Sequence, residues 1–392
     1  MFPPPTGPVP NVEQVRELDD SFFASDPFGY FRARIESLIV HAQGAQVDYG
    51  TALGDDYRRR LGSEPQHLAT PSADARELQV VVDALSLRQH AAEALIRLWL
   101  AVLQTRTAPP GSVSLWATVA DGETSMMKVL KAIAKTDGAR DPHVVLALLL
   151  PHDVVPAFGM NEQLQQAVAV AEEWLVHAEK LLTRADLSFS GAHNKAKHGL
   201  AIRARADLRL DAVFEMPPHD EGTLPVSAMD GAIPIFDRPV LEYLMRPPCG
   251  GKGTQGLELV QLRLDAASLL VESTMLATVH AAVFHVAAAR HAAWSTTVGA
   301  IPPYPTLPLG PTPTQLLGKA VTGMRFPVTD RPDGTPTTRP SGIGFNNGAF
   351  IPLVFDHEAH GRVTLVDDGP VARPLPTEGP LPEDGFREGR AP

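Results

Sequence analysis

Apolar residues recur every three or four positions along three long segments of the chain, a spacing that places them on one face of an α-helix. The first segment begins at Asp74, which is followed three residues later by Glu77 as in a capping box. The second follows Asn161, and the third covers Ala266 to Trp294. The first two apolar stripes are Leu78, Val82, Leu85, Ala92, Ile96, Trp99 and Leu103, and then Leu164, Val168, Ala171, Leu175, Ala178 and Leu182. This repeat predicts long helices packed in a bundle.

Shorter helices are predicted over Val12 to about His41, with an interruption near Asp26-Pro27, and over Thr124 to Lys135. Residues 43–72 are mostly polar and are predicted to form a connection. The segment Val144 to Leu150 is very apolar, so it fits either a buried helical turn or a strand.

The spacing of apolar residues changes from a helical period to strict alternation after the second long helix. Apolar and polar residues alternate from Ala201 to Leu210, which predicts a strand and the start of a small sheet. Leu257 to Leu264 is a further candidate strand. Phe350 to Phe355 and Arg362 to Val366 flank the turn DHEAHG and are predicted to form a hairpin.

The predicted fold is therefore mainly α, a helical bundle with a small accessory β portion. Its expected parts are a flexible N-terminus (1–11), a helical N-terminal segment (12–72), a helical bundle core (73–200), a strand-containing portion (201–366) around the long helix 266–294, and a disordered tail (367–392). The tail is predicted to be disordered because it is rich in proline and acidic residues and has little apolar surface to bury.

Composition narrows the class of protein. The 392 residues are 44% hydrophobic, enough for a large core. Cys249 is the single cysteine, which excludes an intramolecular disulfide and zinc sites that need several cysteines from one chain. The N-terminus lacks the basic start and apolar core of a secretory signal, so a cytoplasmic location is expected. The apolar stretch Ser273 to Ala289 contains His280 and His285, and a buried helix explains it better than a membrane span.

Charge is distributed unevenly. The net charge of −11 argues against a surface that is basic everywhere. Between Lys180 and Arg209, however, the sequence contains seven basic residues and only two acidic ones, Asp186 and Asp207. The basic residues are Lys180, Arg184, Lys195, Lys197, Arg203, Arg205 and Arg209. This local excess points to an anionic ligand.

The sequence His193-Asn194-Lys195-Ala196-Lys197-His198-Gly199 lies inside this basic segment. Two imidazoles that titrate near neutrality are suited to act as general base and general acid at a phosphodiester, with the lysines holding the phosphate. Arg203 and Arg205 are candidates for further phosphate contacts. The alternative is a solvated junction at which Gly199 ends a helical turn. The five-residue separation of the histidines disfavours zinc, because a helical metal pair needs a four-residue step, and we expect neither metal nor cofactor.

The first long helix supplies three supporting candidates, Arg88, His90 and Glu93. Glu93 and Arg97 are four residues apart and most simply form a surface ion pair. Alternatively, these side chains line the bundle cleft opposite His198 and orient its imidazole.

A helical bundle that carries His-Asn-x-x-x-His resembles the HEPN superfamily, whose active members are usually metal-independent ribonucleases with an Arg-x(4 to 6)-His motif. In this resemblance Asn194 and His198 match the polar residue and the histidine of the motif, and His193 stands where the arginine belongs. The resemblance covers at most residues 74–200. It implies RNA as substrate or ligand and a homodimer in which two motifs face one another. The alternative function is a noncatalytic helical scaffold that recognises a protein partner through proline-rich ends.

Two further segments contain short motifs that resemble functional ones. Pro247 to Gln255 looks like the phosphate loop of adenylate kinases, but Arg246 stands where the first glycine is required and Cys249 replaces another, so a glycine loop is favoured over nucleotide binding. His357-Glu358-Ala359-His360 lacks the metalloprotease spacing and is interpreted as a polar turn. Trp99, Trp174 and Trp294 are expected to be core anchors on the three long helices.

Overall fold

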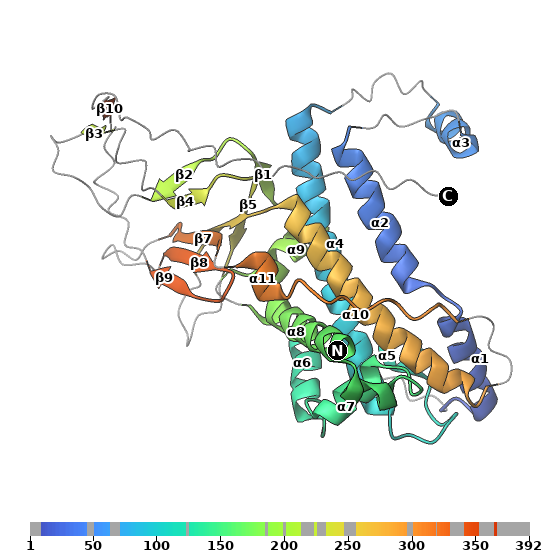
Figure 1. The fold of residues 1–392 in the computed structure, drawn as a ribbon. Coiled ribbons are helices and arrows are strands. Elements are labelled where there is room, and N and C mark those ends of the chain that lie inside the picture. Colours follow the sequence, from blue (N-terminus) through green and yellow to red (C-terminus); the bar gives the residue numbers. More distant parts are fainter. Residues whose placement is uncertain are drawn as a thin grey trace, which may run out of the picture. The chain divides into compact units, whose positions relative to one another are not determined.

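The structure is a computed structural model of the whole chain. It describes residues 9–44, 51–62, 71–122, 125–184, 187–198, 201–212, 223–225, 233–246, 256–295, 301–318, 320–329, 341–352 and 364–366. The chain divides into two compact units. The first unit comprises residues 1–209 and 235–355, and the second comprises residues 210–234 and 356–392. The fold is mainly α, with a small antiparallel sheet in the first unit (Figure 1).

The N-terminal helices begin and end at residues that cap or interrupt a helix. Helices α1 (Val12–Phe23) and α2 (Pro27–Ala42) are separated before Pro27, as predicted, and Asp26 caps α2 through the backbone N–H of Gly29. The predicted connection over residues 43–72 is wrong in one part, because it contains α3 (Ala52–Leu61). Helix α3 has no apolar stripe to reveal it. It is stabilised at its ends instead, by the Thr51 cap and by the left-handed Gly62 that follows three arginines.

Helix α4 (Ala73–Thr105) is the longest described helix, with 33 residues. Its cap is Ser72, whose hydroxyl accepts from the N–H of Ala75, so the predicted capping box at Asp74 is wrong by two residues. Helices α5 (Leu115–Ala120), α6 (Met126–Lys135) and α7 (Pro142–Leu149) follow. Helix α7 resolves the ambiguous apolar segment as helical, because Asp141 caps it and proline is tolerated in a first turn.

A short 3₁₀ helix (Val155–Met160) leads into α8 (Glu162–Thr183), which Asn161 caps as predicted. Helix α9 (Phe189–Lys197) follows, and the third predicted long helix is α10 (Ala266–Ala292). Helix α11 (Pro313–Leu317) is a single short turn with a capping box.

Six strands form the antiparallel sheet of the first unit, in the order β1-β5-β6-β7-β8-β9. They are β1 (Arg203–Arg205), β5 (Val240–Met245), β6 (Glu258–Arg263), β7 (Val321–Pro327), β8 (Gly342–Phe345) and β9 (Phe350–Pro352). Strand β6 confirms the candidate strand at 257–264. The alternation at 201–210 is realised in β1 over three residues only, and Leu210 already begins β2 (Leu210–Ala212). Strand β4 (Ile233–Phe236) precedes β5.

The predicted hairpin of residues 350–355 with 362–366 is wrong. Strand β9 pairs with β8 through a tight turn that contains Gly348. In the second unit, β10 (Thr364–Val366) pairs in parallel with β3 (Thr223–Pro225). The turn DHEAHG lies outside the described residues. Strand pairing over long sequence separations decides these partners, and hydrophobic alternation carries no information about it.

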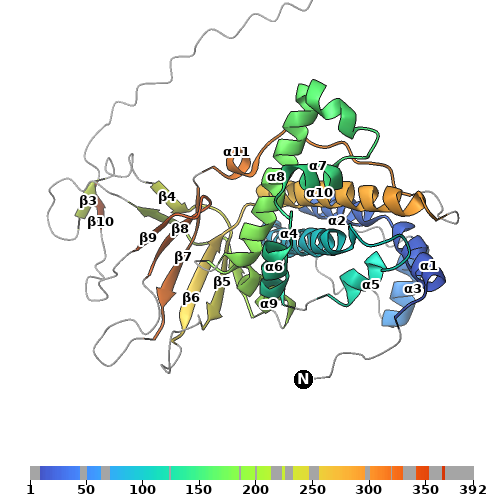
Figure 2. The ribbon, with the colours of Figure 1, turned by 90° about the horizontal axis from the view of Figure 1, so that it is seen from below.

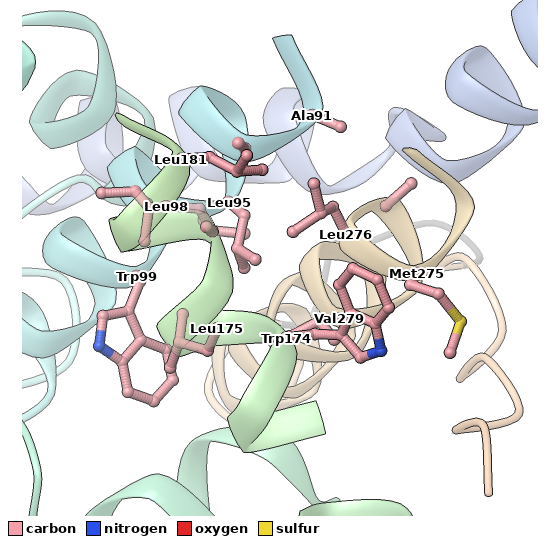
Figure 3. Close-up of a cluster of buried hydrophobic side chains, with 14 of the residues drawn as sticks. Ala91, Leu95, Leu98, Trp99, Trp174, Leu175, Leu181, Met275, Leu276 and Val279 are labelled. Atoms are coloured by element: carbon pink, nitrogen blue, oxygen red, sulfur yellow. The ribbon is translucent and has the colours of Figure 1, made fainter. Parts of the chain in front are cut away.

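The core lies where α4, α8 and α10 pack together (Figures 1 and 2). Trp99 of α4 and Trp174 of α8 are fully buried there, among the apolar side chains shown in Figure 3. They confirm two of the three expected anchors, whereas Trp294 follows the end of α10 and is only partly buried. Helix α10 runs along α4, and α2 packs on both, so α10 belongs to the helical layer although it connects two strands of the sheet.

Helix α10 is the one described helix that is long and apolar enough to cross a membrane. Within the protein, 78% of its most apolar window is buried. Packing against α4 and α2 therefore explains its hydrophobicity.

Candidate functional site

The predicted histidine motif lies on α9, whose first turn is firmly attached to the sheet and the bundle. Ser188 caps the helix, since its hydroxyl accepts from the N–H of Gly191 at 3.0 Å. The hydroxyl of Tyr243 on β5 donates to the carbonyl of Ser188 at 2.7 Å, and Phe189 and Ala192 are buried. The motif thus stands on an anchored helix, with His198 as the residue that ends it.

The polar side chains of the motif mostly face solvent. Asn194, Lys195, Lys197 and His198 are exposed, whereas His193 is half-buried. The Nδ1 atom of His193 is buried and has no hydrogen-bond partner among the described residues. Burial lowers the pKa of His193 below its ordinary value, and the positive charges of Lys197 and His198 lower it further. His193 is therefore biased toward the neutral form, which accepts a proton.

His90 of α4 lies beside α9. Burial is the main cause that lowers the pKa of His90, and positive charges nearby lower it further. These charges are Arg34 on α2 and His193 and Lys197 on α9, whereas Glu93 acts in the opposite direction. The ring of His90 also packs edge-on against Tyr30 and Phe31 of α2, with centroid distances of 5.8 and 5.2 Å.

We refer to His90, His193, Lys197, His198 and Arg34 as the α9 cluster. In this cluster, charged groups of α2 and α9 act on the pKa of His90, and Lys197 and His198 act on the pKa of His193. Arg34, Tyr30 and Phe31 were not predicted, because α2 precedes the motif by more than 150 residues and only its packing against α4 brings them here. A run of aromatic and basic residues, Tyr30-Phe31-Arg32-Ala33-Arg34, was the one signal available.

The other predicted basic residues lie on β1, where carboxylates partly neutralise them. Arg205 donates to Asp207, with Nε 2.7 Å from Oδ1, and its Nη1 is 3.5 Å from Oε1 of Glu242. Arg203 is more loosely placed, with its Nε 3.8 Å from Oε2 of Glu242 and its side chain 68% exposed. Arg203 is thus the more available of the two for an external anion.

Arg88 lies apart from the α9 cluster. Its side chain is 5% exposed and its Nη1 donates to Oε1 of Glu272 on α10 at 3.1 Å. Its guanidinium also covers the ring of Phe189 at 4.6 Å. Arg88 therefore contacts α10 and the buried face of α9, whereas Glu93, which is half-buried, acts on His90.

Among the described residues, no group of three or more His, Cys, Asp and Glu side chains is placed to hold a metal ion. The glycine loop at 247–255 and the His357–His360 turn lie outside the described residues. Comparison of the chain with protein-family models, with curated proteins and with solved structures found no match.

Proposed function

We propose that this chain is a HEPN-like protein that binds RNA at the α9 cluster and cleaves it without a metal ion. The observation that carries the proposal is the grouping of His193, His198 and His90 with Lys197 and Arg34. An imidazole that favours its neutral form, a second imidazole and fixed cations are the groups that acid-base cleavage of a phosphodiester uses.

In the proposed reaction, His193 is the general base because burial and its neighbours favour its neutral form. It takes the proton of a ribose 2′-hydroxyl, and the oxygen attacks the adjacent phosphorus. His198, which is exposed at the end of α9, protonates the leaving 5′-oxygen. The products are a 2′,3′-cyclic phosphate and a 5′-hydroxyl. Lys197 and Lys195 stabilise the charge that develops on the phosphate oxygens.

The test incubates the purified full chain with labelled single-stranded RNA in EDTA. We expect cleavage with 2′,3′-cyclic phosphate ends, and no cleavage at a 2′-deoxy position placed in the same strand. His193→Ala and His198→Ala should each reduce the rate by roughly 100-fold or more, because general acid-base catalysis contributes factors of this size. Lys131→Ala/Lys135→Ala, which removes two exposed charges from α6, should leave the rate unchanged.

If the wild type and His198→Ala leave the RNA equally intact, the chain is not a ribonuclease of this kind. Filter binding then separates the remaining possibilities. Binding that Lys195→Ala/Lys197→Ala weakens would retain RNA recognition without cleavage, and no binding at all would remove RNA from the proposal.

The HEPN resemblance leads us to propose a homodimer whose two α9 clusters face one another. Light scattering of the purified protein should then give twice the 42.1 kDa of one chain. The scaffold alternative is supported by exposed apolar side chains on α2, where Tyr30, Ile39 and Val40 are 50%, 42% and 50% exposed. A monomer that neither binds nor cleaves RNA would favour that alternative.

A further inference from the structure

Arg88 is buried with two of its three guanidinium nitrogens unpaired. Its Nη1 donates to Glu272, but its Nε and Nη2 have no hydrogen-bond partner among the described residues. Unpaired buried donors are rare in folded proteins because they lose their hydration without compensation, and a charged donor loses more than a neutral one. A site that leaves two of them on one guanidinium therefore needs an explanation.

The two unpaired nitrogens lie on the same edge of the guanidinium. Their N–H groups point in nearly parallel directions, so this edge forms a two-pronged donor that matches two oxygens of a carboxylate or phosphate. One face of the guanidinium is covered by Phe189 at 4.6 Å, which leaves the edge with Nε and Nη2 as the geometry that suits an anion.

Glu272 cannot supply the missing acceptor, because both of its oxygens are already occupied. Oε1 accepts from Arg88 at 3.1 Å, and Oε2 is 2.8 Å from Nε2 of His177 on α8. Burial by itself raises the pKa of Glu272, but Arg88 and His177 together hold it below the ordinary value. Glu272 thus remains a carboxylate that fixes the position of Arg88.

Arg88, Phe189 and Glu272 line a cavity of about 250 Å³ between the helices and the sheet. Its wall also contains Arg238 and Arg263, and Arg184 adjoins it through Thr322, whose hydroxyl is 3.4 Å from its Nη1. The described carboxylates near these four arginines are Asp237, paired with Arg263, Asp265, 3.7 Å from Arg238, and Glu272. Arg88, Arg238 and Arg263 each have one of these carboxylates as a partner, and of the three only Arg88 also keeps two buried, unpaired nitrogens.

A larger pocket of about 920 Å³ adjoins this cavity and shares Leu317 and Asn346 with it. One face of α8, the short helix α11 and the turn between β8 and β9 line it. His177 lies in its wall, on the other side of Glu272 from Arg88. Its volume is in the range of pockets that hold small organic ligands.

We propose that the Arg88 cavity is a binding site for the oxyanion group of a small molecule, a carboxylate or a phosphate. Nε and Nη2 of Arg88 have almost no accessible surface in the unliganded protein, and the side chain turns them toward the cavity to hold the oxyanion by two parallel hydrogen bonds. The body of the ligand occupies the adjoining pocket beside His177. The site is separate from the α9 cluster and does not depend on RNA binding.

The test titrates the full chain with inorganic phosphate and, in parallel, with acetate, succinate and citrate, against sodium chloride at equal ionic strength. Calorimetry and the midpoint of thermal unfolding are the two readouts. We expect saturable binding of at least one oxyanion and a rise in the unfolding midpoint, because a ligand that binds only the folded state stabilises it. The phosphate and carboxylate series show which group the site takes.

Arg88→Lys keeps the charge but removes the two-pronged edge, and it should weaken binding at least tenfold. If this variant is poorly folded, Arg88→Met/Glu272→Met removes both partners of the buried pair together, which proteins tolerate better than the loss of one. It should fold and show no saturable binding. Arg32→Lys on the exposed face of α2 is the matched control and should bind like the wild type.

The proposal is overturned if the wild type shows no heat and no stabilisation beyond sodium chloride with any of the four anions. It is also overturned if a folded Arg88 variant binds with unchanged affinity. Neither result bears on RNA cleavage, which is assayed separately with His193 and His198 variants.

Discussion

Among single residues, His280 of α10 has the most strongly altered chemistry of the described histidines. It is buried between Phe31 and Phe284, whose ring centroids lie 6.3 and 6.2 Å from its own. Its Nδ1 has no hydrogen-bond partner among the described residues. Burial, with a smaller contribution from the charge of His90, lowers the pKa of His280 from 6.5 to about 4. The folded protein therefore keeps this imidazole neutral where the unfolded chain is protonated.

This difference predicts acid sensitivity. Between pH 6.5 and about 4 the unfolded chain binds a proton that folded His280 does not, so the free energy of unfolding falls on acidification. The contribution approaches about 1.4 kcal/mol per pH unit and about 3 kcal/mol in total. His280→Leu, which fills a similar volume, should flatten the loss between pH 6.5 and 4 in urea titrations. His143→Leu replaces an exposed histidine and should leave the loss of stability between pH 6.5 and 4 unchanged. Equal pH profiles for the two variants would contradict the prediction.

At the scale of elements, side-chain caps decide where helices begin and which helices are joined. Asp19 of α1 is 4% exposed and caps a different helix, α5. Its carboxylate accepts from the hydroxyl of Ser114 at 2.7 Å and from the N–H groups of Leu115 and Trp116 at 3.0 and 3.1 Å. It thus satisfies donors that a helix start leaves free and ties α1 to α5 across about 95 residues.

Asp19→Ala should therefore lower the free energy of unfolding by about 2–4 kcal/mol, because it leaves a hydroxyl and two backbone N–H groups unpaired in a buried position. Chemical denaturation followed by circular dichroism measures this loss. Glu17→Ala, on the exposed face of the same helix, is the matched control and should change stability by less than about 0.5 kcal/mol. Similar losses in both variants would mean that the cap contributes little.

For the whole molecule, the net charge of −11 opposes nucleic-acid binding everywhere except at local excesses of positive charge. The fold pairs some of the basic side chains in the segment 180–209 with other groups of the protein and leaves others exposed. Arg184 binds the carbonyl of Phe345, Arg205 is paired with Asp207, and Lys195, Lys197 and Arg203 remain exposed. Proposed RNA contacts are therefore limited to a few phosphates.

The salt dependence of RNA binding should reflect this small number. Three phosphate contacts predict that the logarithm of the binding constant falls with the logarithm of salt concentration with a slope of about −2. Lys195→Ala/Lys197→Ala should make the slope shallower by about 1.4. The control Lys131→Ala/Lys135→Ala should keep the wild-type slope, and an unchanged slope in the first variant would place the binding surface elsewhere.

The helices with a strong apolar stripe or an unambiguous cap could be predicted from local sequence. Asn161 and the stripe behind it define α8, and Pro27 separates α1 from α2. Prediction failed where local signals are weak or compete. Helix α3 is highly charged, and Ser72 rather than Asp74 caps α4 because its hydroxyl reaches the N–H of Ala75. The partner of β9 depends on pairing over distance, which alternation does not specify.

For the candidate site too, one part could be predicted from local sequence and another part could not. His193, Lys197 and His198 are close in sequence, so one short helix presents them together. His90 was recognised as a candidate, but its position beside α9 and the contribution of Arg34 follow from the packing of α2, α4 and α9. Arg88 shows the limit most clearly. Its place on α4 follows from helical periodicity, whereas its contact with Glu272, 184 residues later, requires the packed bundle.

By itself, the sequence of this protein determined its mainly helical class, the position of its long helices and a basic segment that contains the histidine motif. These properties depend on spacings of a few residues, within which periodicity and capping act. Only the tertiary structure decided which strands pair, which histidines share an electrostatic environment and that Arg88, which keeps two unpaired nitrogens, lines a cavity. Those outcomes depend on burial and on contacts between distant segments, which exist only after the chain has packed.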